Sequence, residues 1–473
     1  MTPTLGSNAH PLRIAIVGSG PSGFYTAEHL LKQDRWTVEI DMYDRLPTPF
    51  GLVRGGVAPD HAKIKSVTRV YDRTAAHPNF RFYGNVTFGT DITHADLTRY
   101  YHAIIYAVGA QTDRRLDIPG EDLAGSHAAT EFVGWYNGHP DYRDLSFDLA
   151  QERVAVIGNG NVATDVVRML ARSEAELHTT DVADYALEEL RQSRVREIYM
   201  LGRRGPVQAR FTTPELKELG ELTDSDIVVA PKELDLDPLS QEYLLSGEDH
   251  TAAHNFEILK QFSQSAPSGR PKKIILRFLV SPVELIGSDH VEAIKVVKNQ
   301  ICERKHFLSP CPTDEFETIP VGLVFRSIGY RGMPLPDVPF DEENGIIPNA
   351  QGRILDTDHR AIAGEYVVGW IKRGPTGIIG TNKPDAQETA KQVLNDIARG
   401  KLLDPVEPAH DAVDAWLRGR GVHFVTYDDW RILDRLEIER GARIGRPRVK
   451  FTDVEEMLAM LGEHKHELVP AGV

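Results

Sequence analysis

Two glycine-rich segments of the same pattern occur in this chain, and each follows a short apolar stretch. They are Gly18-Ser19-Gly20-Pro21-Ser22-Gly23, after residues 12–17, and Gly158-Asn159-Gly160-Asn161-Val162-Ala163, after residues 154–157. The pattern indicates dinucleotide binding when it joins a strand to a helix, as it does at both places here. The first glycine makes a tight turn, the second lets the backbone approach a pyrophosphate, and the third position allows close helix–strand packing. Two such turns predict two dinucleotides held face to face, as in a flavoenzyme reduced by a nicotinamide.

The residue that ends the strand after the first turn is acidic. Residues 38–43 alternate between apolar and polar, as in a half-buried strand, and lead to Asp44. An acid at this position holds the hydroxyls of a ribose. A surface acid at a strand end would look the same in sequence, but the preceding glycines favour ribose binding.

The corresponding strand of the second unit ends in basic residues instead. Residues 196–201 read as this strand, and Gly202, Arg203 and Arg204 follow it. A carboxylate here would repel a 2′-phosphate, whereas guanidinium groups bind it bidentately. Two solvated arginines are the alternative interpretation. Their place at the end of this strand favours NADP over NAD.

Composition limits the classes of protein that the chain can belong to. Its 473 residues predict two or three domains, and the content of 41% hydrophobic and 26% charged residues is typical of a globular protein. No apolar run is long enough to span a membrane, and residues 1–11 lack the features of an export signal, so we expect a cytoplasmic protein. A net charge of -15 argues against general nucleic-acid binding, but it leaves room for a local basic patch that docks a small acidic protein.

The two cysteines, Cys302 and Cys311, are not arranged as C-x-x-C. This spacing argues against a redox-active dithiol of the thioredoxin-reductase kind and against iron–sulfur ligation by this chain. We expect both to be unreactive thiols and expect no metal site.

The order of the segments predicts one domain inserted into another. Strands expected at 321–329 and 364–370 lead into the glycine-rich segment 374–381 and a helix from about residue 383, which suggests that the chain returns to its first domain. The predicted fold is α/β, with two Rossmann-like, three-layer dinucleotide-binding domains. Residues 11–113 and 321–473 form the first, which includes a charged helical tail from about residue 400, and residues 114–320 form the second. The apolar segment 49–61 is expected to cover something flat, such as a flavin ring.

Longer strings of residues resemble the adrenodoxin reductase-type ferredoxin–NADP reductases. They follow the order of that family from about residue 13 to residue 390: GSGPSGFY at 18–25, PFGLVRGGVAPDH at 49–61, FVGWYNG at 132–138, GNGNVATD at 158–165, LRQSRV at 190–195, GRRGP at 202–206 and GWIKRGPTGIIGT at 369–381. The resemblance implies that the cofactors are FAD and NADP(H) and that the electron partner is a ferredoxin-type iron–sulfur protein. Strings of this length are more specific than a glycine fingerprint alone.

The resemblance also implies roles for individual residues. FAD would be held by Gly18, Gly20, Pro21, Ser22, Asp44, Leu52, Val86, Trp370, Gly377, Ile378 and Ile379, and NADP(H) by Arg114, Asn159, Gly160, Asn161, Val162, Arg203, Arg204 and Glu215. His61 and Glu218 would position the nicotinamide and handle the proton that accompanies flavin reduction. A histidine that only caps a loop would look the same as His61, because hydride transfer itself requires no acid or base.

The function that these features predict is an NADPH-dependent flavoprotein reductase that passes a hydride to N5 of FAD and then single electrons to the iron–sulfur protein. Three alternatives stay open. A flavin monooxygenase would carry a histidine-containing fingerprint between the two units, which is not seen, and a disulfide reductase would need a C-x-x-C pair. A noncatalytic, cofactor-binding redox sensor would differ from a reductase only in turnover. We expect a monomer that binds neither nucleic acid nor membrane.

Overall fold

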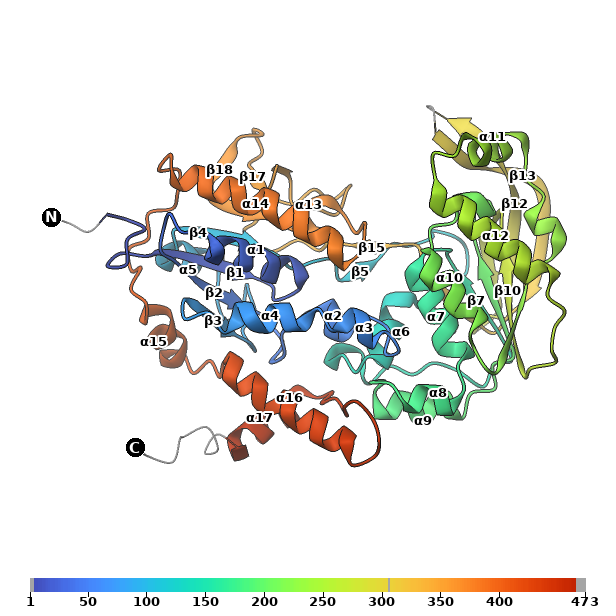
Figure 1. Ribbon diagram of the computed structural model, residues 1–473, viewed down its shortest axis with the longest axis horizontal. Helices are drawn as coiled ribbons and strands as arrows, with labels where there is room; N and C mark the ends of the chain where they lie inside the picture. The colour runs from blue at the N-terminus through green and yellow to red at the C-terminus, as the bar shows by residue number, and fades with distance from the viewer. Residues whose placement is uncertain (1–3, 305–306, 465–473) are drawn as a thin grey trace.

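The computed structural model describes residues 4–304 and 307–464, and it forms two lobes, each built on its own parallel sheet (Figure 1). The first lobe has the strand order β16-β17-β18-β4-β1-β2-β3. These strands are β1 (Leu12–Val17), β2 (Val38–Tyr43), β3 (Phe80–Tyr83), β4 (Ala103–Tyr106), β16 (Asn349–Ala350), β17 (Arg353–Leu355) and β18 (Ala361–Val367). Strands β18, β4, β1, β2 and β3 run parallel, and β16 and β17 add an antiparallel edge.

Helices cover both faces of the first sheet, because residues of β1 point alternately to the two sides. Ile14 and Ile16 pack with the helices of one face, whereas Ala15 and Val17 pack with those of the other. The first face carries α1 (Pro21–Lys32), α4 (Thr68–Ala75), α14 (Asn382–Ile397), α16 (Tyr427–Ala442) and α17 (Val454–His464), and the second carries α5 (His94–Tyr100) and α15 (Ala412–Gly419).

The second lobe has the strand order β6-β14-β7-β8-β10-β9, with all neighbours parallel. Its strands are β6 (Ser126–Ala128), β7 (Arg153–Ile157), β8 (Glu197–Leu201), β9 (Ser225–Val228), β10 (Lys272–Arg277) and β14 (Leu323–Arg326). The helices of this lobe are α6 (Ala129–Tyr136), α7 (Asn161–Ala171), α8 (Glu174–His178), α9 (Asp184–Arg191), α10 (Thr213–Gly220), α11 (Pro238–Ser246) and α12 (His250–Gln264).

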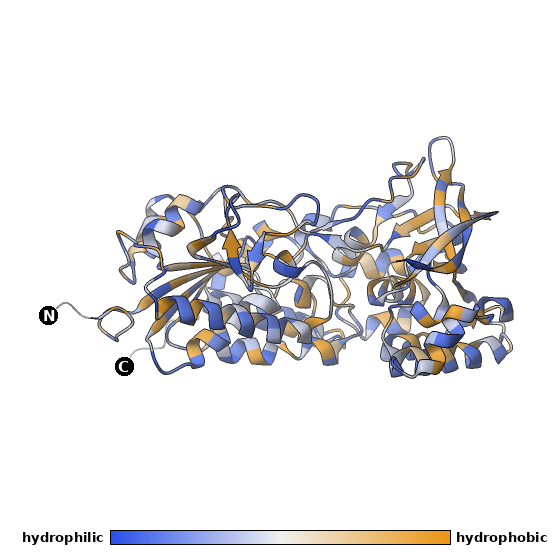
Figure 2. Cartoon of the chain, turned by 90° about the horizontal axis from the view of Figure 1, so that it is seen from above, coloured by the Kyte–Doolittle hydropathy of each residue, from blue (hydrophilic) through white to orange (hydrophobic). Residues whose placement is uncertain are grey.

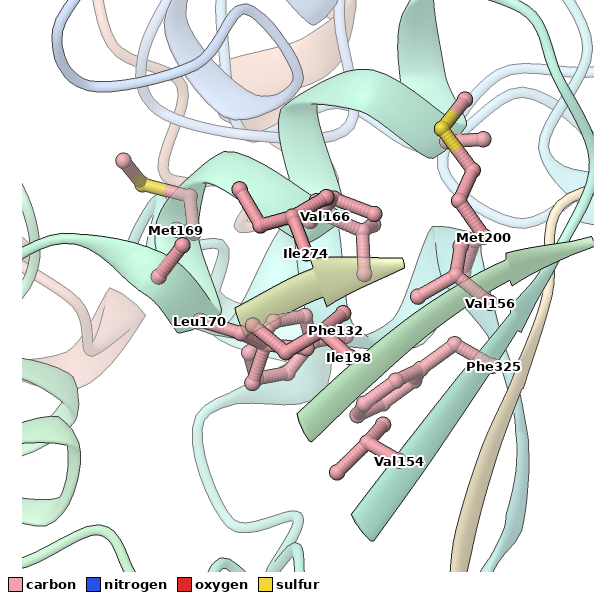
Figure 3. Packing of buried hydrophobic residues seen from close by; sticks show 14 of the residues in the cluster. Phe132, Val154, Val156, Val166, Met169, Leu170, Ile198, Met200, Ile274 and Phe325 are labelled. Atoms are coloured by element: carbon pink, nitrogen blue, oxygen red, sulfur yellow. The ribbon is translucent and has the colours of Figure 1, made fainter. Parts of the chain in front are cut away.

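The two faces of the second sheet are covered differently. Val154 and Val156 of β7 meet the helices, with Phe132 of α6 and Val166 of α7 in the same buried cluster (Figure 3). The other face, which includes Ala155, packs on an antiparallel sheet made of β11 (Val280–Ile286), β12 (Ala293–Arg304) and β13 (Phe307–Pro320). The predicted α/β class and the pair of three-layer Rossmann-like units are confirmed, although one outer layer of the second unit is a sheet. Figure 2 shows the same two bodies from above, with hydrophobic strands inside each.

The chain crosses between the lobes later than the predicted boundary at residue 320. Strand β14 pairs with β7 in the second sheet, although the sequence suggested that residues 321–329 had already returned to the first domain. The buried residues of β14 lie in the second sheet between β6 and β7. The crossing itself is a short antiparallel pair, β5 (Thr112–Asp113) with β15 (Tyr330–Arg331).

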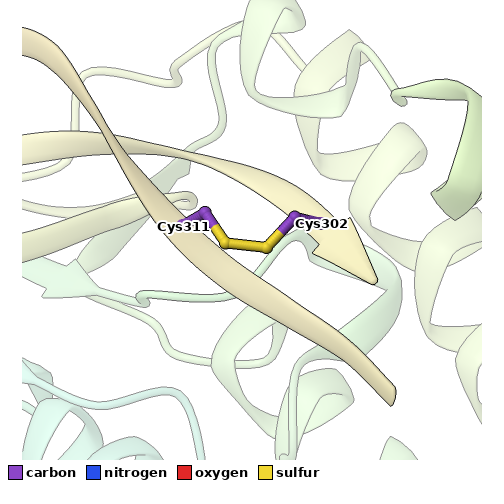
Figure 4. The surroundings of a disulfide bond; sticks show 2 residues. All are labelled: Cys302 and Cys311. Atoms are coloured by element: carbon purple, nitrogen blue, oxygen red, sulfur yellow. A yellow bond between two sulfur atoms is a disulfide. The ribbon is translucent and has the colours of Figure 1, made fainter. Parts of the chain in front are cut away.

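The expectation of two free thiols is wrong, because Cys302 and Cys311 form a disulfide (Figure 4). They lie on neighbouring antiparallel strands, β12 and β13, where Gln300 pairs opposite Cys311. This register brings the two Cα atoms to 6.1 Å, within the usual reach of a disulfide. The sequence spacing alone gave no indication of the hairpin that brings the two residues together.

Residues 443–453, which join α16 to α17, contact both lobes, and we call this segment the strap. On the second lobe, the Lys450 Nζ donates to the carbonyl of Asn137 at 3.0 Å and lies 3.4 Å from Asp181. On the first lobe, Arg448 pairs with the buried carboxylate of Glu437 at 3.0 Å. Lys450 is almost fully buried, and this burial lowers its pKa well below the ordinary value although Asp181 opposes the change. The strap is therefore packed as part of the core and not as a loose connection.

Two tryptophans of the C-terminal part differ in burial. Trp430 of α16 is buried in the core of the first lobe, whereas Trp416 of α15 is partly buried against Tyr100. Across residues 4–304 and 307–464, no helix has the length and apolar character that a membrane span requires.

Candidate functional site

The first glycine turn joins β1 to α1 and leaves open space in front of its second glycine. Gly18 has φ +109°, and a Cβ there would lie 2.5 Å from the carbonyl oxygen of Ala107. A Cβ on Gly23 would lie 2.3 Å from the carbonyl oxygen of Gly18. A Cβ on Gly20, in contrast, would meet no described heavy atom within 4 Å beyond its chain neighbours. The outer glycines serve the fold, and the middle one leaves a cradle that a pyrophosphate fits.

Asp44 is bonded to this turn, where the sequence placed the ribose acid. Its carboxylate accepts a hydrogen bond from the Ser19 N–H at 3.0 Å and another from the Ser19 hydroxyl, and the Leu46 N–H donates to the other oxygen at 3.0 Å. Burial raises the pKa of Asp44, while these hydrogen bonds act in the opposite direction. A carboxylate can accept about four hydrogen bonds, so Asp44 keeps capacity for a hydroxyl. Val86 lies next to it, because its N–H donates to the Asp44 carbonyl at 2.9 Å.

The apolar segment 49–61 closes onto the same turn. A Cβ on Gly51 would lie 3.0 Å from the Cα of Gly20, and the Phe50 N–H donates to the Ser19 carbonyl at 3.0 Å. Phe50 has φ +86°, a strained conformation for a residue with a side chain, and is held by ring contacts in the core. Leu52 then begins the short helix α2 (Leu52–Gly55). The segment is thus fixed beside the first turn.

The glycine-rich segment 369–381 approaches the first turn from the other side. A Cβ on Gly369 would lie 2.1 Å from Ser22 Oγ, and this hydroxyl donates to Asn382 Oδ1 at 3.0 Å, at the start of α14. Trp370 begins the short helix α13 (Trp370–Arg373), and its Nε1 donates to the Thr376 carbonyl at 3.2 Å. The remaining predicted flavin residues of this segment, Gly377, Ile378 and Ile379, follow directly, and Ile378 is 59% exposed. The contacts described for Asp44, Gly51 and Gly369 therefore place the predicted flavin residues around the carboxyl end of β1, a central strand of the first sheet.

The second glycine turn repeats the geometry of the first. Gly158 has φ +140°, and a Cβ there would lie 2.3 Å from the carbonyl oxygen of Ser327. A Cβ on Gly160 would meet only the Cβ of Arg210, at 4.0 Å, among the described residues outside its chain neighbours. The side-chain nitrogen of Asn159 is buried and has no hydrogen-bond partner in the described part of the chain. This turn, too, leaves space and one unused donor for a ligand.

Three further residues predicted to bind NADP(H) lie at two places, at the start of α7 and at the crossing between the lobes. The Asn161 side chain accepts from the Thr212 N–H at 2.8 Å, which ties α7 to the segment before α10, and Val162 follows it in the first turn of α7. Arg114 is exposed at the crossing between the lobes, where its N–H donates to the Gly329 carbonyl at 3.0 Å.

Three arginines gather beside the second turn without acidic partners. Arg203 and Arg204 follow β8, and Arg210 lies beside Gly160. No carboxylate in the described residues forms an ion pair with any of the three. Burial, followed by the positive charges of Arg210 and Arg203, lowers the pKa of Arg204. Such a group of cations fits a ligand with several negative charges. The sequence reasoning named the first two and missed Arg210, which stands outside the glycine and strand-end motifs.

The structure brings the predicted catalytic residues, His61 and Glu218, into contact across the junction of the lobes. His61 lies at the start of α3 (Ala62–Lys65), and its Nε2 is 2.8 Å from Glu218 Oε2 on α10. The same nitrogen lies 2.8 Å from a guanidinium nitrogen of Arg168 on α7. Burial disfavours protonation of His61, but the hydrogen bond to Glu218 and the nearby Asp165 outweigh it, so the pKa of His61 is raised. The hydrogen bond from His61 lowers the pKa of Glu218.

Arg168 connects this pair to a larger set of buried charges. Its side chain is fully buried and forms ion pairs with Asp60 at 2.5 Å, Asp165 at 2.6 Å and Glu215 at 2.9 Å. Burial raises the pKa of Asp165 to about 7, against the opposing effect of Arg168. Glu215, predicted to bind NADP(H), is buried in this set. The sequence reasoning missed Asp60, Asp165 and Arg168, although the last two stand one helical turn apart on α7.

A cation of the protein already lies among the possible metal ligands of this cluster. Ligand atoms of His61, Glu215 and Glu218 lie within 4.8 Å of one another, a spacing that a metal could use. Arg168, however, lies 2.9 Å from Glu215 and 3.4 Å from Glu218, so a cation already occupies this position. The chemistry open to the junction is therefore positioning and proton handling.

Two parallel-sheet lobes, each with an open glycine turn, define the class of pyridine-nucleotide-dependent oxidoreductases. A family model described as pyridine nucleotide-disulphide oxidoreductase matches residues 12–203. The NADPH-ferredoxin reductase FprA of Mycobacterium tuberculosis is 45% identical over 462 residues, which cover 95% of this chain and 98% of that protein. The human mitochondrial NADPH:adrenodoxin oxidoreductase is 40% identical over 467 residues, covering 95% and 92%.

Comparison with solved structures agrees. The structure of Mycobacterium tuberculosis FprA in complex with NADPH matches with a TM-score of 0.90 and 44% identity, covering 96% of this chain and all of that one. The chain belongs to the family of NADPH–ferredoxin reductases that includes adrenodoxin reductase. Its disulfide lies in the β12–β13 hairpin, on the antiparallel sheet of the second lobe, and not in either turn.

Proposed function

We propose that this chain is an NADPH-dependent flavoprotein reductase that delivers single electrons to a ferredoxin-type iron–sulfur protein. The observation that carries the proposal is the pair of open turns, one beside an acid and the other beside three arginines, joined by the His61–Glu218 contact. Family membership agrees with this assignment. The predicted role of the first lobe is FAD binding, and that of the second is NADP(H) binding.

The residues of the first lobe fit FAD. The cradle at Gly20 would take the pyrophosphate, and Asp44 would accept a ribose hydroxyl. The segment 369–381, with Trp370 and Gly377–Ile379, lies where it would border the flavin. The chemistry that bound FAD supplies is acceptance of a hydride from NADPH at N5 and release of the electrons one at a time.

The residues of the second lobe fit NADP(H). Gly160 leaves space for the pyrophosphate at the start of α7, and Asn159 holds an unused donor there. Arg203 and Arg204 would bind the 2′-phosphate, because two unpaired guanidinium groups match a dianion in charge and geometry. Arg114, at the crossing, and Asn161–Val162, at the helix start, would complete the site.

His61 and Glu218 would act at the junction by holding a proton and fixing position. The raised pKa of His61 favours its protonated form, which donates to the Glu218 carboxylate. Flavin reduction by a hydride also takes up a proton, so a protonated group nearby is chemically useful although hydride transfer does not require it. Because one residue comes from each lobe, the contact also sets how the lobes approach.

The proposal extends to the partner and the setting of the reaction. The FprA proteins and adrenodoxin reductase are named for ferredoxin-type acceptors, and we propose an acceptor of the same chemistry here. A monomeric state and a cytoplasmic location remain predictions from the sequence.

An anaerobic titration of the purified protein with NADPH tests the proposal. We expect a flavin absorbance spectrum that bleaches with about one equivalent of NADPH and much less readily with NADH. Single-electron transfer is then checked by reduction of an oxidised ferredoxin at catalytic enzyme concentration. Absence of flavin, or a flavin that NADPH does not reduce, would contradict the proposal and favour a noncatalytic cofactor-binding protein.

A further inference from the structure

Arg210 stands beside the second glycine turn without an assigned role. It lies in the segment 205–210 after β8, which contains the short 3-10 helix Pro206–Gln208. We infer that Arg210 is a third phosphate-binding arginine of the NADP(H) site and that it binds the pyrophosphate rather than the 2′-phosphate. The inference rests on the proposed function and deepens it, because it concerns how the same dinucleotide is held.

The backbone of Arg210 is attached directly to the turn. Its N–H donates to the Asn159 carbonyl at 2.9 Å, and Gly160 and Arg210 form a parallel bridge. A Cβ built on Gly160 would point into the space where the pyrophosphate is expected, and the nearest atom there is the Arg210 Cβ, 4.0 Å away. The side chain of Arg210 therefore begins at the edge of the pyrophosphate cradle.

The segment that carries Arg210 is held firmly. Val207 and Phe211, on either side of it, are buried, and Gln208 donates to the Ser240 hydroxyl of α11 at 2.9 Å. A side chain on a fixed backbone loses less conformational freedom on binding than one on a free loop. Arg210 itself is exposed, so its guanidinium is available to a ligand.

The charges around Arg210 favour an anionic ligand. No ion pair joins Arg210 to an acid of the described chain, and its charge acts together with that of Arg203 to lower the pKa of Arg204. The pyrophosphate otherwise meets the start of α7, whose first turn has no charged residue. Arg203 and Arg204 directly follow the strand that positions a 2′-phosphate ligand, and Arg114 lies at the crossing between the lobes, so Arg210 is the cation beside the glycine turn that is left for the pyrophosphate.

Two ligands separate the two phosphate positions. NADP+ carries both the pyrophosphate and the 2′-phosphate, whereas 2′-AMP carries the 2′-phosphate without a pyrophosphate. Binding of each to the flavin-loaded protein is measured by titration calorimetry. The variants are Arg210→Gln, Arg210→Lys and Arg204→Gln, with Arg196→Gln as a matched control at the other end of β8, where the arginine is also exposed.

We expect Arg210→Gln to weaken NADP+ about tenfold, the loss typical of one charge-assisted hydrogen bond, and to leave 2′-AMP nearly unchanged. Arg210→Lys, which keeps the charge, should recover part of the affinity. Arg204→Gln should weaken both ligands, and Arg196→Gln neither. Flavin content and thermal midpoint identify any variant that is misfolded. If Arg210→Gln is misfolded, Arg210→Lys is compared with the wild-type protein instead.

Two results would overturn the inference. Unchanged NADP+ affinity in Arg210→Gln would remove the third arginine from the site, and an equal loss for NADP+ and 2′-AMP would move it to the 2′-phosphate. The proposed function fails separately, if NADPH does not reduce the flavin of the wild-type protein. Calorimetry does not depend on that reduction, so the two failures are distinguishable.

Discussion

The two glycine turns have the same backbone, but their charged residues are in opposite states. At the first turn, Asp44 is partly buried, and its carboxylate is bonded to the N–H and hydroxyl of Ser19 and to the N–H of Leu46. At the second, Arg203 and Arg204 have no ion-pair partner among the described residues, and Arg203 is exposed. The Asp44 carboxylate already accepts hydrogen bonds from the protein, whereas the guanidinium groups of Arg203 and Arg204 are left for a ligand.

The difference indicates how each nucleotide is held. A carboxylate fixed by its own loop presents a rigid acceptor to neutral hydroxyls, so binding there depends on shape and burial, as suits a resident cofactor. Exposed arginines bind an anion through charge, which salt weakens and which allows release. On the proposed function, the first turn suits a tightly held dinucleotide and the second suits one that exchanges at every turnover.

Replacement of Asp44 by Ala should have the largest effect on this comparison. It removes the ribose acceptor and leaves the Ser19 N–H without its partner, so we expect the purified protein to retain less than about half of its FAD. Flavin absorbance per protein measures the loss. Asp34→Ala, an exposed acid before β2, is the matched control. A fully yellow Asp44→Ala protein would show that Asp44 is not the ribose ligand.

Arg203→Gln combined with Arg204→Gln should raise the KM for NADPH about a hundredfold, because two charge-assisted contacts are lost. The KM for NADH, which has no 2′-phosphate, should change little. Steady-state kinetics with both nucleotides measures the split, and the flavin content should stay at the wild-type value. Equal changes for both nucleotides would contradict 2′-phosphate binding by this pair.

Alanine at the middle glycines compares the two cradles directly. Gly20→Ala and Gly160→Ala place a methyl group where the structure has room, so the thermal midpoints of the ligand-free proteins should change little. Gly20→Ala should lower FAD content, and Gly160→Ala should raise the KM for NADPH by about tenfold, because each methyl group occupies the pyrophosphate space. Gly23→Ala, which would meet the Gly18 carbonyl, should instead destabilise the fold. Normal nucleotide binding by both middle-glycine variants would place the pyrophosphates elsewhere.

The smallest expected effect concerns pH, through Asp165 of α7. Its pKa is raised from 3.8 to about 7, so the folded state keeps a proton that the unfolded state has lost, and stability falls as pH rises from about 4 to 7. His61, whose pKa is raised above 6.5, adds a loss of stability as pH rises through its folded pKa. Thermal midpoints from pH 5 to 8 should decline less steeply in Asp165→Asn. The same slope in both proteins would rule out Asp165 as the source.

The sequence was sufficient for the fold class and for much of the candidate site because the informative signals are local. Gly18 and Gly158 adopt positive φ angles at strand ends, and such turns leave a pattern within six residues. The strand-end positions of Asp44 and Arg203 are also local, since they follow from strand length. The roles expected of His61 and Glu218 came instead from a family resemblance, and their contact was not predicted, because no pattern within either segment indicates the other.

Features that depend on contacts between distant segments could not be predicted in this way. Arg168 forms ion pairs with Asp60 from the loop before α3 and with Glu215 from α10, and only tertiary packing brings these residues together. The disulfide depends on the register of the β12–β13 hairpin. The sheet that β14 joins depends on which of the two sheets has space for another strand. Arg210 was missed for the same reason, because its neighbour Gly160 is distant in sequence.

The strap has a consequence for how the molecule is assembled. Lys450 and Arg448 are inserted into opposite lobes, and they are synthesised only after both parallel sheets have left the ribosome. Asp60 and His61 already contact Arg168 and Glu218 across the junction, so the strap adds the last of the buried contacts between the lobes. The alignment of the two nucleotide turns is therefore completed by a late docking step. An electron-transfer defect could consequently arise from a change at Lys450, even with both turns intact.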